Sequence, residues 1–461
     1  MHLKILLIHP KLEKSYFSDI RLPPLGLAYI AAALREAGFN RVRILDANIS
    51  RHPNEEILGA LSSEPPDVVG LSLTTPLFET GLEISRTIKK RSPETKVIFG
   101  GVHPTIFPGD VAGMESVDFV VFGEGERTVV DLARALEQGR SPDDVSGVAF
   151  KRDGRVIINA PRPFIKDLDE LPLPAYDLLP IRRYSNPQSA HAPLGMMLTS
   201  RGCPFRCIFC DSRIVLGKKY RAYSAPRMIR EWRILVGEFG VKEIMFKESD
   251  FTLDRERVLE FCELLMREPK RIPWTCNGHI GLMDPVLLRE MRRSGCRLIQ
   301  YGVESGDQNI LDTLKKNITI PQVIETFRMT REAGIRAVAN IMIGNPGDTR
   351  ETIARSIALA KDIKADFANF QSCAPFPGTE LHRMAAENGW FLGEGDALHL
   401  RSDSCSMNAT DIPTPELRGM LKKAYRSFYF RPTYILRRLA SLNIEDWRTN
   451  LRGLLKLTGI S

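Results

Sequence analysis

Three cysteines, Cys203, Cys207 and Cys210, lie within eight consecutive residues. Cysteine thiolates are soft ligands and the usual ligands of iron–sulfur clusters. A [4Fe-4S] cubane has one iron more than three cysteines can bind, so one iron stays open to another ligand. An open coordination position distinguishes catalytic metal sites from structural ones. The spacing therefore predicts a [4Fe-4S] cluster, with these three residues as its metal-binding and catalytic ligands.

A zinc site, or a set of unrelated buried cysteines, is the competing interpretation. Structural zinc normally has ligands in two pairs, and no second pair of cysteines or histidines follows the triplet nearby. No cysteine precedes Cys203. The remaining cysteines are scattered, and we expect them to be buried packing residues; they are Cys262, Cys276, Cys296, Cys373 and Cys405.

The context of the triplet is equally specific. An apolar run over residues 196–198 predicts a buried strand before it, and Phe209 directly precedes its last cysteine. Cys-x-x-x-Cys-x-x-Cys with this aromatic residue resembles the cluster motif of the radical S-adenosylmethionine (SAM) superfamily. The resemblance implies that the open iron binds the amino and carboxylate groups of SAM and that Phe209 lies near the adenine. It also implies reductive cleavage of SAM to a 5′-deoxyadenosyl radical.

Composition bounds the class of protein. The chain has 461 residues, of which 43% are hydrophobic and 26% charged, as in ordinary soluble proteins of two or three domains. The formal net charge of +8 is modest, and much of the basic excess follows Arg418, so we expect no nucleic-acid binding. Without a signal peptide, a bilayer-length apolar run or an even cysteine framework, a cytoplasmic location is expected.

The first part of the chain alternates between strand and helix patterns. Strands are expected at 4–10, 42–46, 67–73, 96–100 and 119–122, and helices at 24–38, 55–62, 77–91 and 126–138. This alternation predicts an α/β fold with a doubly wound, Rossmann-like parallel sheet over residues 1–142. Ligands of such sheets bind at the carboxyl ends of the strands.

The loops at those ends indicate the ligand. No Gly-x-Gly-x-x-Gly follows the first strand, so a dinucleotide is disfavoured. PPLGLAYIAAALREAG, GGVHPT and FGEGE, in that order, resemble the cobalamin-binding domain attached to one large radical SAM branch. The resemblance implies cobalamin contacts from these loops, at Thr74, Gly100, Gly101, His103, Gly123 and Glu124.

Simpler interpretations of these loops remain open. The glycines fit plain turn chemistry, and His103 fits a turn at the edge of the sheet. Asp-x-His-x-x-Gly, which places a histidine on cobalt in methionine-synthase-type domains, is absent, and His9 lacks the rest of that motif. We therefore expect cobalamin to bind without a protein histidine on cobalt.

The second part of the chain predicts a barrel. Residues 143–193 form a hairpin, turned at Asp153–Gly154, and a proline-rich linker. Six strand–helix units follow and favour a partial (β/α)6 TIM-type barrel over 194–395, with its site at the carboxyl ends of the strands. Its strands are expected at 196–198, 243–246, 273–277, 298–303, 336–343 and 367–374.

Polar motifs fall at those strand ends. By resemblance, Gly302, Glu304 and Ser305 contact the polar end of SAM, and Ile343 belongs to the segment that packs on its adenine and ribose. FKESDFTLD places Glu248 and Asp250 over the site, with helix N-caps or surface ion pairs as the alternative. His279 either faces the substrate or caps a loop, and we favour the cap.

The last segment, 396–461, is basic and helical in pattern, most clearly over 422–439. Such a helix either packs on the barrel or lies on an anionic membrane surface, and we favour packing. Peripheral membrane contact therefore stays a secondary expectation.

Together these motifs predict an enzyme with a [4Fe-4S] cluster, SAM and cobalamin. The leading hypothesis is methylation of an unactivated carbon of a small-molecule or lipid substrate; oxidative cyclisation or ring rearrangement with the same cofactors is the alternative. A one-electron reductant of the flavodoxin or ferredoxin type is the expected partner. Methylthiotransferases and enzymes with auxiliary clusters need cysteines that this chain lacks, and the cysteine triplet argues against a mere cobalamin carrier.

Overall fold

The computed structural model describes residues 2–11, 21–186, 188–393, 405–432 and 434–436. These residues fall into two compact units. The first combines the chain up to Ser185 with the segments Arg201–Pro204 and Asp211–Tyr223, and the second contains the rest. Cys203 therefore belongs to the first unit, and Cys207 and Cys210 belong to the second.

The first unit is built on a seven-stranded sheet in the order β2-β1-β3-β4-β5-β6-β7. The first five strands are parallel, and the last two form an antiparallel hairpin turned at Asp153–Gly154. The order 2-1-3-4-5 is that of a doubly wound sheet, which confirms the predicted fold class. The strands are β1 (Ile5–His9), β2 (Val42–Asp46), β3 (Val68–Ser72), β4 (Lys96–Gly100), β5 (Phe119–Val121), β6 (Val148–Arg152) and β7 (Arg155–Ile158).

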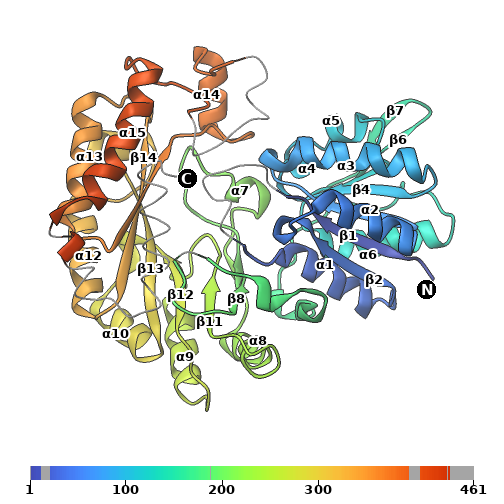
Figure 1. Ribbon diagram of the computed structural model, residues 1–461, viewed down its shortest axis with the longest axis horizontal. Helices are drawn as coiled ribbons and strands as arrows, with labels where there is room; N and C mark the ends of the chain where they lie inside the picture. Colours follow the sequence, from blue (N-terminus) through green and yellow to red (C-terminus); the bar gives the residue numbers. More distant parts are fainter. Residues whose placement is uncertain (1, 12–20, 187, 394–404, 433, 437–461) are drawn as a thin grey trace. The chain divides into compact units, whose positions relative to one another are not determined.

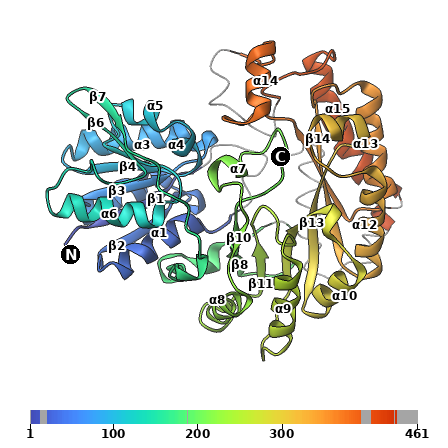
Figure 2. The same ribbon diagram turned by 180° about the vertical axis from the view of Figure 1, so that it is seen from behind.

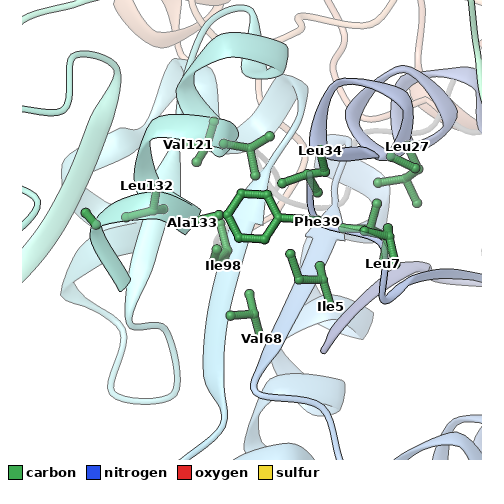
Figure 3. Close-up of a cluster of buried hydrophobic side chains, with 14 of the residues drawn as sticks. Ile5, Leu7, Leu27, Leu34, Phe39, Val68, Ile98, Val121, Leu132 and Ala133 are labelled. Atoms are coloured by element: carbon green, nitrogen blue, oxygen red, sulfur yellow. The ribbon is translucent and has the colours of Figure 1, made fainter. Parts of the chain in front are cut away.

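Helices α1 (Leu25–Glu36) and α6 (Gly125–Glu137) contact each other and cover part of this sheet. In α6 the buried residues Val129, Leu132 and Ala133 recur at helical spacing, so one stripe of the helix faces the strands. Figure 3 shows Phe39 in the middle of the resulting core. Helices α2 (Pro53–Ser63) and α3 (Phe78–Arg91) complete the predicted alternation.

The connection from β4 to β5 differs from the prediction. Two short helices, α4 (Val102–Ile106) and α5 (Pro108–Gly113), occupy a segment expected to be a loop, so His103 lies in a helix rather than a turn. Prolines such as Pro104 and Pro108 are tolerated in a first helical turn, where their missing N–H needs no partner. Prolines in this segment therefore do not exclude short helices, although the sequence pattern predicts a loop.

The second unit is built on a six-stranded, wholly parallel sheet in the order β15-β14-β13-β12-β11-β8. The strands follow one another in chain order and the first does not pair with the last, which is the predicted partial barrel. They are β8 (Leu194–Met197), β11 (Glu243–Phe246), β12 (Trp274–Gly278), β13 (Cys296–Glu304), β14 (Arg336–Ile343) and β15 (Phe367–Ser372).

Helices connect these strands and lie along one side of the sheet in both views (Figures 1 and 2). Several begin at a side-chain cap, as in α12 and α13, where Thr319 and Thr349 form capping boxes. The connecting helices are α8 (Ala225–Gly237), α9 (Arg255–Met266), α10 (Pro285–Arg293), α11 (Gln308–Thr313), α12 (Ile320–Glu332) and α13 (Arg350–Asp362), and α14 (Glu380–Asn388) follows the last strand.

The basic segment packs on the barrel as far as it is described. Helix α15 (Thr414–Tyr429) lies against β15, where the Tyr429 hydroxyl donates to the Ala368 carbonyl at 2.9 Å. The helix starts before the predicted 422–439 and ends at Tyr429, after which residues 434–436 are again helical and residues 437–439 lie outside the described part. Residues 437–461 lie outside the described part of the chain. None of the described helices is long and apolar enough to span a bilayer.

Candidate cofactor sites at the ends of the two sheets

The loop that carries Cys203 is fixed by backbone geometry. Gly202 has φ +84°, and a Cβ there would lie 2.1 Å from the Lys219 carbonyl oxygen, so only glycine fits. The Cys203 N–H donates to the Gly217 carbonyl at 3.1 Å. The first predicted cluster ligand is therefore held by the segment 217–219 of the same unit.

Arg201, two residues before Cys203, belongs to a buried group of four charged side chains. Arg201 pairs with Glu124 at 3.1 Å and with Glu126 at 2.5 Å, and Arg221 pairs with Glu124 at 2.8 Å. All four side chains are at most 12% exposed, and the Arg201 guanidinium also lies over the ring of Tyr29. Two positive and two negative charges balance, so the desolvation of each is offset by its partners.

The loop that carries Cys207 and Cys210 is held in the second unit. The Ile208 N–H donates to the Leu314 carbonyl at 3.1 Å, and its own carbonyl accepts from the Leu381 N–H at 2.9 Å. Ile208 is buried in an apolar cluster against which Phe209 packs. Phe209 is thereby positioned between two predicted ligands, and its proximity to adenine stays a prediction.

The thiols of the triplet differ from the other cysteines in exposure. Cys203, Cys207 and Cys210 are half-buried, and none of the eight cysteines forms a disulfide. The other five are buried as predicted, and burial raises the pKa of Cys262 to about 12, which makes it inert. Half-buried thiols fit the ligands of an iron–sulfur cluster.

Among the described residues, no three His, Cys, Asp or Glu side chains are arranged so that they could bind a single metal ion. In a cubane each thiolate binds a different iron, so the thiolates need not surround one point. The donor set therefore suits a cluster better than zinc.

An ion pair lies at the carboxyl end of β13. The Lys316 ammonium is 2.9 Å from a Glu304 carboxylate oxygen, and both side chains are at most 13% exposed. Glu304 has φ +64°, at a register shift between β13 and β14. Sequence reasoning found Glu304 but missed Lys316. The adjacent Lys315 is exposed, and nothing in the sequence tells the two lysines apart.

The neighbouring predicted SAM contacts lie at the same sheet edge. Ser305 is fully buried, with its hydroxyl 3.2 Å from that of Ser356 on α13. Ile343 is buried at the end of β14. β14 pairs directly with β13, so these residues end neighbouring strands as the sequence predicted.

Glu248 and Asp250 are neither helix caps nor surface pairs, and that alternative is wrong. They are 2% and 6% exposed. Glu248 accepts from the Thr199 hydroxyl, and one oxygen of each carboxylate has no partner among the described residues. Burial raises the pKa of Asp250 to about 6, although hydrogen bonds from Thr252 oppose the shift.

His279 caps a loop, as favoured from the sequence. Its Nδ1 accepts from the Gly281 N–H at 3.2 Å. Its ring also stacks on Phe205, at 4.1 Å between centroids and 8° between planes, which ties it to the cysteine loop. Burial lowers the pKa of His279 to about 4, and the charge of Lys316 adds to the shift.

The carboxyl ends of β3 to β5 offer small side chains to a ligand. Thr74 is exposed, and a Cβ at Gly123 would meet no atom within 4 Å. Gly101 instead lies against backbone, since its Cβ would be 2.8 Å from Leu73 atoms. Gly100 ends β4 beside them. An edge of small residues with open space fits the flat face of a corrin.

Of the two histidines at this edge, His103 is a packing residue and His9 is half-buried at the end of β1. His103 is 2% exposed, packs against Phe78 with 4.1 Å between ring centroids and 35° between planes, and has its Nδ1 3.2 Å from the Thr75 hydroxyl. Burial lowers the pKa of both His103 and His9 to about 4, so both rings are neutral at pH 7. No contact in the structure tests the prediction that cobalt carries no protein histidine.

Glu124 is the remaining predicted cobalamin contact, and its carboxylate already has hydrogen-bond partners within the protein. One carboxylate oxygen accepts from Arg201 and Arg221, and the other accepts from the Ile165 N–H at 2.7 Å. Arg221 also donates to the Ile165 carbonyl at 2.6 Å. The Gly123–Glu126 loop is thus joined to the linker and to the segment before Cys203.

Comparison with known proteins agrees with this division. The model of the B12 binding domain matches residues 19–133, and that of the Radical SAM superfamily matches residues 197–360. An uncharacterized methyltransferase of Pyrococcus horikoshii is 33% identical over 99% of this chain and 98% of its own length. The chain belongs to the cobalamin-binding radical SAM family.

Two further relatives of this cobalamin-binding radical SAM enzyme are informative. An anaerobic magnesium-protoporphyrin IX monomethyl ester cyclase of Rubrivivax gelatinosus is 28% identical over 94% of this chain and 78% of its own length. The radical SAM methyltransferase TsrM of Kitasatospora setae, solved with cobalamin and a [4Fe-4S] cluster, superposes with a TM-score of 0.72. It is 20% identical over 86% of this chain and 80% of its own, so it shows a shared fold.

Proposed function

We propose that this cobalamin-binding radical SAM enzyme is a C-methyltransferase that acts on an unactivated carbon of a small-molecule or lipid substrate. The observation that carries the proposal is the near full-length match to a protein named as a methyltransferase. The structure supports it because one chain contains both a thiol triplet beside charged residues and a neutral, glycine-rich sheet edge.

The cluster and SAM belong, in this proposal, to the region 194–395. Cys203, Cys207 and Cys210 hold the cluster, while Gly302, Glu304 and Ser305 bind the charged end of SAM. Phe209 and Ile343 border its adenine and ribose. When bound, the cluster supplies the electron that cleaves SAM, and cobalamin supplies the methyl group. The chain's own contribution is to place the reacting carbon and to exclude water.

Cobalamin belongs to the region 1–142, which the linker 143–193 joins to the barrel. Thr74, Gly100, Gly101 and Gly123 border the corrin through backbone and small side chains. His103 supports this edge by packing, because its ring is buried against Phe78. Glu124 shapes the Gly123–Glu126 loop, since both its carboxylate oxygens already accept hydrogen bonds.

Oxidative cyclisation or ring rearrangement with the same cofactors is the second candidate. A relative named as a cyclase, 28% identical to this chain, supports it. Methyl transfer from SAM leaves S-adenosylhomocysteine, whereas a reaction without methyl transfer leaves only 5′-deoxyadenosine and methionine. The products derived from SAM therefore separate the two candidates before any substrate is known.

The test uses the full chain, reconstituted anaerobically with iron, sulfide and hydroxocobalamin and reduced with titanium(III) citrate. S-adenosylhomocysteine and 5′-deoxyadenosine are quantified after addition of SAM. The proposal expects S-adenosylhomocysteine only in the cobalamin-loaded protein. Formation of 5′-deoxyadenosine alone, with cobalamin retained, would reject methyl transfer in favour of the second candidate.

Partners follow from this chemistry. The cluster needs an external one-electron donor, for which a flavodoxin or ferredoxin is proposed. Membrane contact through 396–461 stays a secondary proposal, because α15 packs on β15 and residues 437–461 are outside the described part of the chain. Vesicle flotation of the full chain, with anionic and neutral lipids compared, measures that contact directly.

A further inference from the structure

The Glu304–Lys316 ion pair depends on three local features that converge on one place. Glu304 is a non-glycine residue with φ +64°, a backbone conformation that costs about 1–3 kcal/mol. A register shift between Gly302 and Glu304 gives it this position. A Cβ at Gly302 would lie 2.3 Å from the Glu304 carboxylate and 2.7 Å from the Lys316 ammonium. Glycine at 302 therefore makes room for the pair.

The pair lies beside the cysteine loop. The Ile208 N–H donates to the Leu314 carbonyl, so the residue between two predicted cluster ligands is bonded to the chain two residues before Lys316. Burial opposes the charge of Lys316, but the Glu304 carboxylate, 2.9 Å away, outweighs it and raises the pKa of the ammonium, and Cys207 and Cys210 contribute in the same direction. Lys316 thus stays charged at pH 7, with two residues of the cysteine loop among its electrostatic neighbours.

We infer that Lys316 and Glu304 set the reduction potential of the iron–sulfur cluster, with opposite signs. Reduction takes one electron from the external donor and adds one negative charge to the cluster. The Lys316 ammonium stabilises that charge, and the Glu304 carboxylate destabilises it. Charge near an iron–sulfur cluster is a recognised determinant of its potential. In a buried site such an interaction is weakly screened by salt.

This inference rests on the cluster of the proposed function but not on methyl transfer. The proposal of methyl transfer and the inference about the reduction potential can be disproved separately. A wild-type protein that forms no cluster overturns both proposals. A wild-type protein with a cluster and no S-adenosylhomocysteine overturns only methyl transfer, and the potentials of its variants still decide the role of the pair.

The experiment is a redox titration of the cluster in the full chain without SAM, followed by EPR of the reduced form. Lys316→Gln removes a positive charge, so the midpoint potential should fall. The expected fall in midpoint potential is about 59 mV, which for a one-electron couple lowers the ratio of reduced to oxidised cluster tenfold at a fixed potential. Glu304→Gln removes a negative charge, so its midpoint should rise. The double variant should lie between the two single variants.

Lys315→Gln is the matched control. It removes the same charge from the adjacent residue, whose partner Glu380 is 2.7 Å away in an exposed pair. Water and salt screen that charge, so its midpoint should equal that of the wild type. A general loosening of the site would shift Lys316→Gln and Glu304→Gln in the same direction. Shifts of the same sign, or equal shifts in Lys315→Gln and Lys316→Gln, would overturn the inference.

Discussion

The carboxyl ends of the two parallel sheets carry different kinds of side chain. At the seven-stranded sheet the loops present glycine and threonine, and the two carboxylates of the Gly123–Glu126 loop are buried in ion pairs with arginines. At the six-stranded sheet they present the Glu304–Lys316 pair, buried carboxylates and half-exposed thiols. The edge of the first unit is thus neutral only in net charge, because Glu124 and Glu126 are balanced by Arg201 and Arg221, whereas that of the second unit carries buried carboxylates without such a balance.

The difference matches the two cofactors. A corrin is broad and flat, so backbone and small residues can border it closely. The amino and carboxylate groups of SAM carry charge and need partners of opposite charge where water is excluded. His103, a cobalamin contact by resemblance, is buried against Phe78 in the structure.

The largest expected effect is that of a substitution in the cysteine triplet. Cys207→Ala should abolish cluster formation and SAM cleavage, because two thiolates remain where three are needed. Cobalamin retention should be unchanged, since the neutral edge belongs to the other sheet. Iron content, 5′-deoxyadenosine and bound cobalamin measure the three effects. Cys405→Ala, at a buried position outside the triplet, should keep all of them. Loss of cobalamin in Cys207→Ala would contradict the separation of the two ends.

The buried charge group of the first unit predicts the next effect. Arg201→Met leaves Glu126 buried without its ion-pair partner, which should cost about 3–5 kcal/mol of unfolding free energy. Arg328→Met removes an exposed pair with Glu325 and should cost less than about 1 kcal/mol. Urea unfolding, followed through the first transition, compares the two. Equal losses would show that the buried group adds nothing beyond a surface pair.

The neutral histidines predict a pH dependence. The pKa of folded His103 is about 4 against 6.5 for the free side chain, so the unfolded chain binds the proton first as pH falls. Stability is unaffected above pH 6.5 and falls between pH 6.5 and 4, by up to about 3 kcal/mol from this residue.

His103→Asn should remove that share of the pH slope. His9, His279 and His382, whose pKa values burial also lowers, keep their shares. Asp46 and Asp250, whose pKa values burial raises to about 6, act in the opposite direction. The slope should therefore decrease without disappearing. Thermal unfolding measured between pH 7 and pH 5 checks this. An unchanged slope would mean that His103 is protonated while folded.

The smallest expected effects are those of substitutions at two glycines, which test whether cobalamin binds at the neutral edge. Gly101→Ala should cost stability by steric overlap, because its Cβ would lie 2.8 Å from Leu73 backbone atoms. Gly123→Ala meets no atom within 4 Å, so only its φ of +79° costs about 1 kcal/mol. Cobalamin affinity should nevertheless fall in Gly123→Ala, because the new methyl group points into open space that the corrin would fill. Unchanged affinity would move the corrin away from this loop.

Sequence patterns predicted the strands of both sheets well, because buried parallel strands are short apolar runs between helical segments. The cysteine triplet was equally visible, since its spacing is local. Arg201 and its partners were missed because 77 and 75 residues separate them, so only tertiary folding brings them together. Lys316 was missed for a different reason, because burial alone distinguishes it from Lys315.

The most direct test of the central claim is cobalamin binding by the anaerobically reconstituted full chain after desalting. Cobalt and iron contents, absorption and EPR spectra are recorded, with a second preparation labelled with ¹⁵N-histidine. We predict stoichiometric cobalamin together with a cluster that cleaves SAM, and a cobalt EPR spectrum that the histidine label does not change. SAM cleavage without retained cobalamin, or a cobalt spectrum altered by the label, would contradict the neutral, histidine-free cobalamin edge.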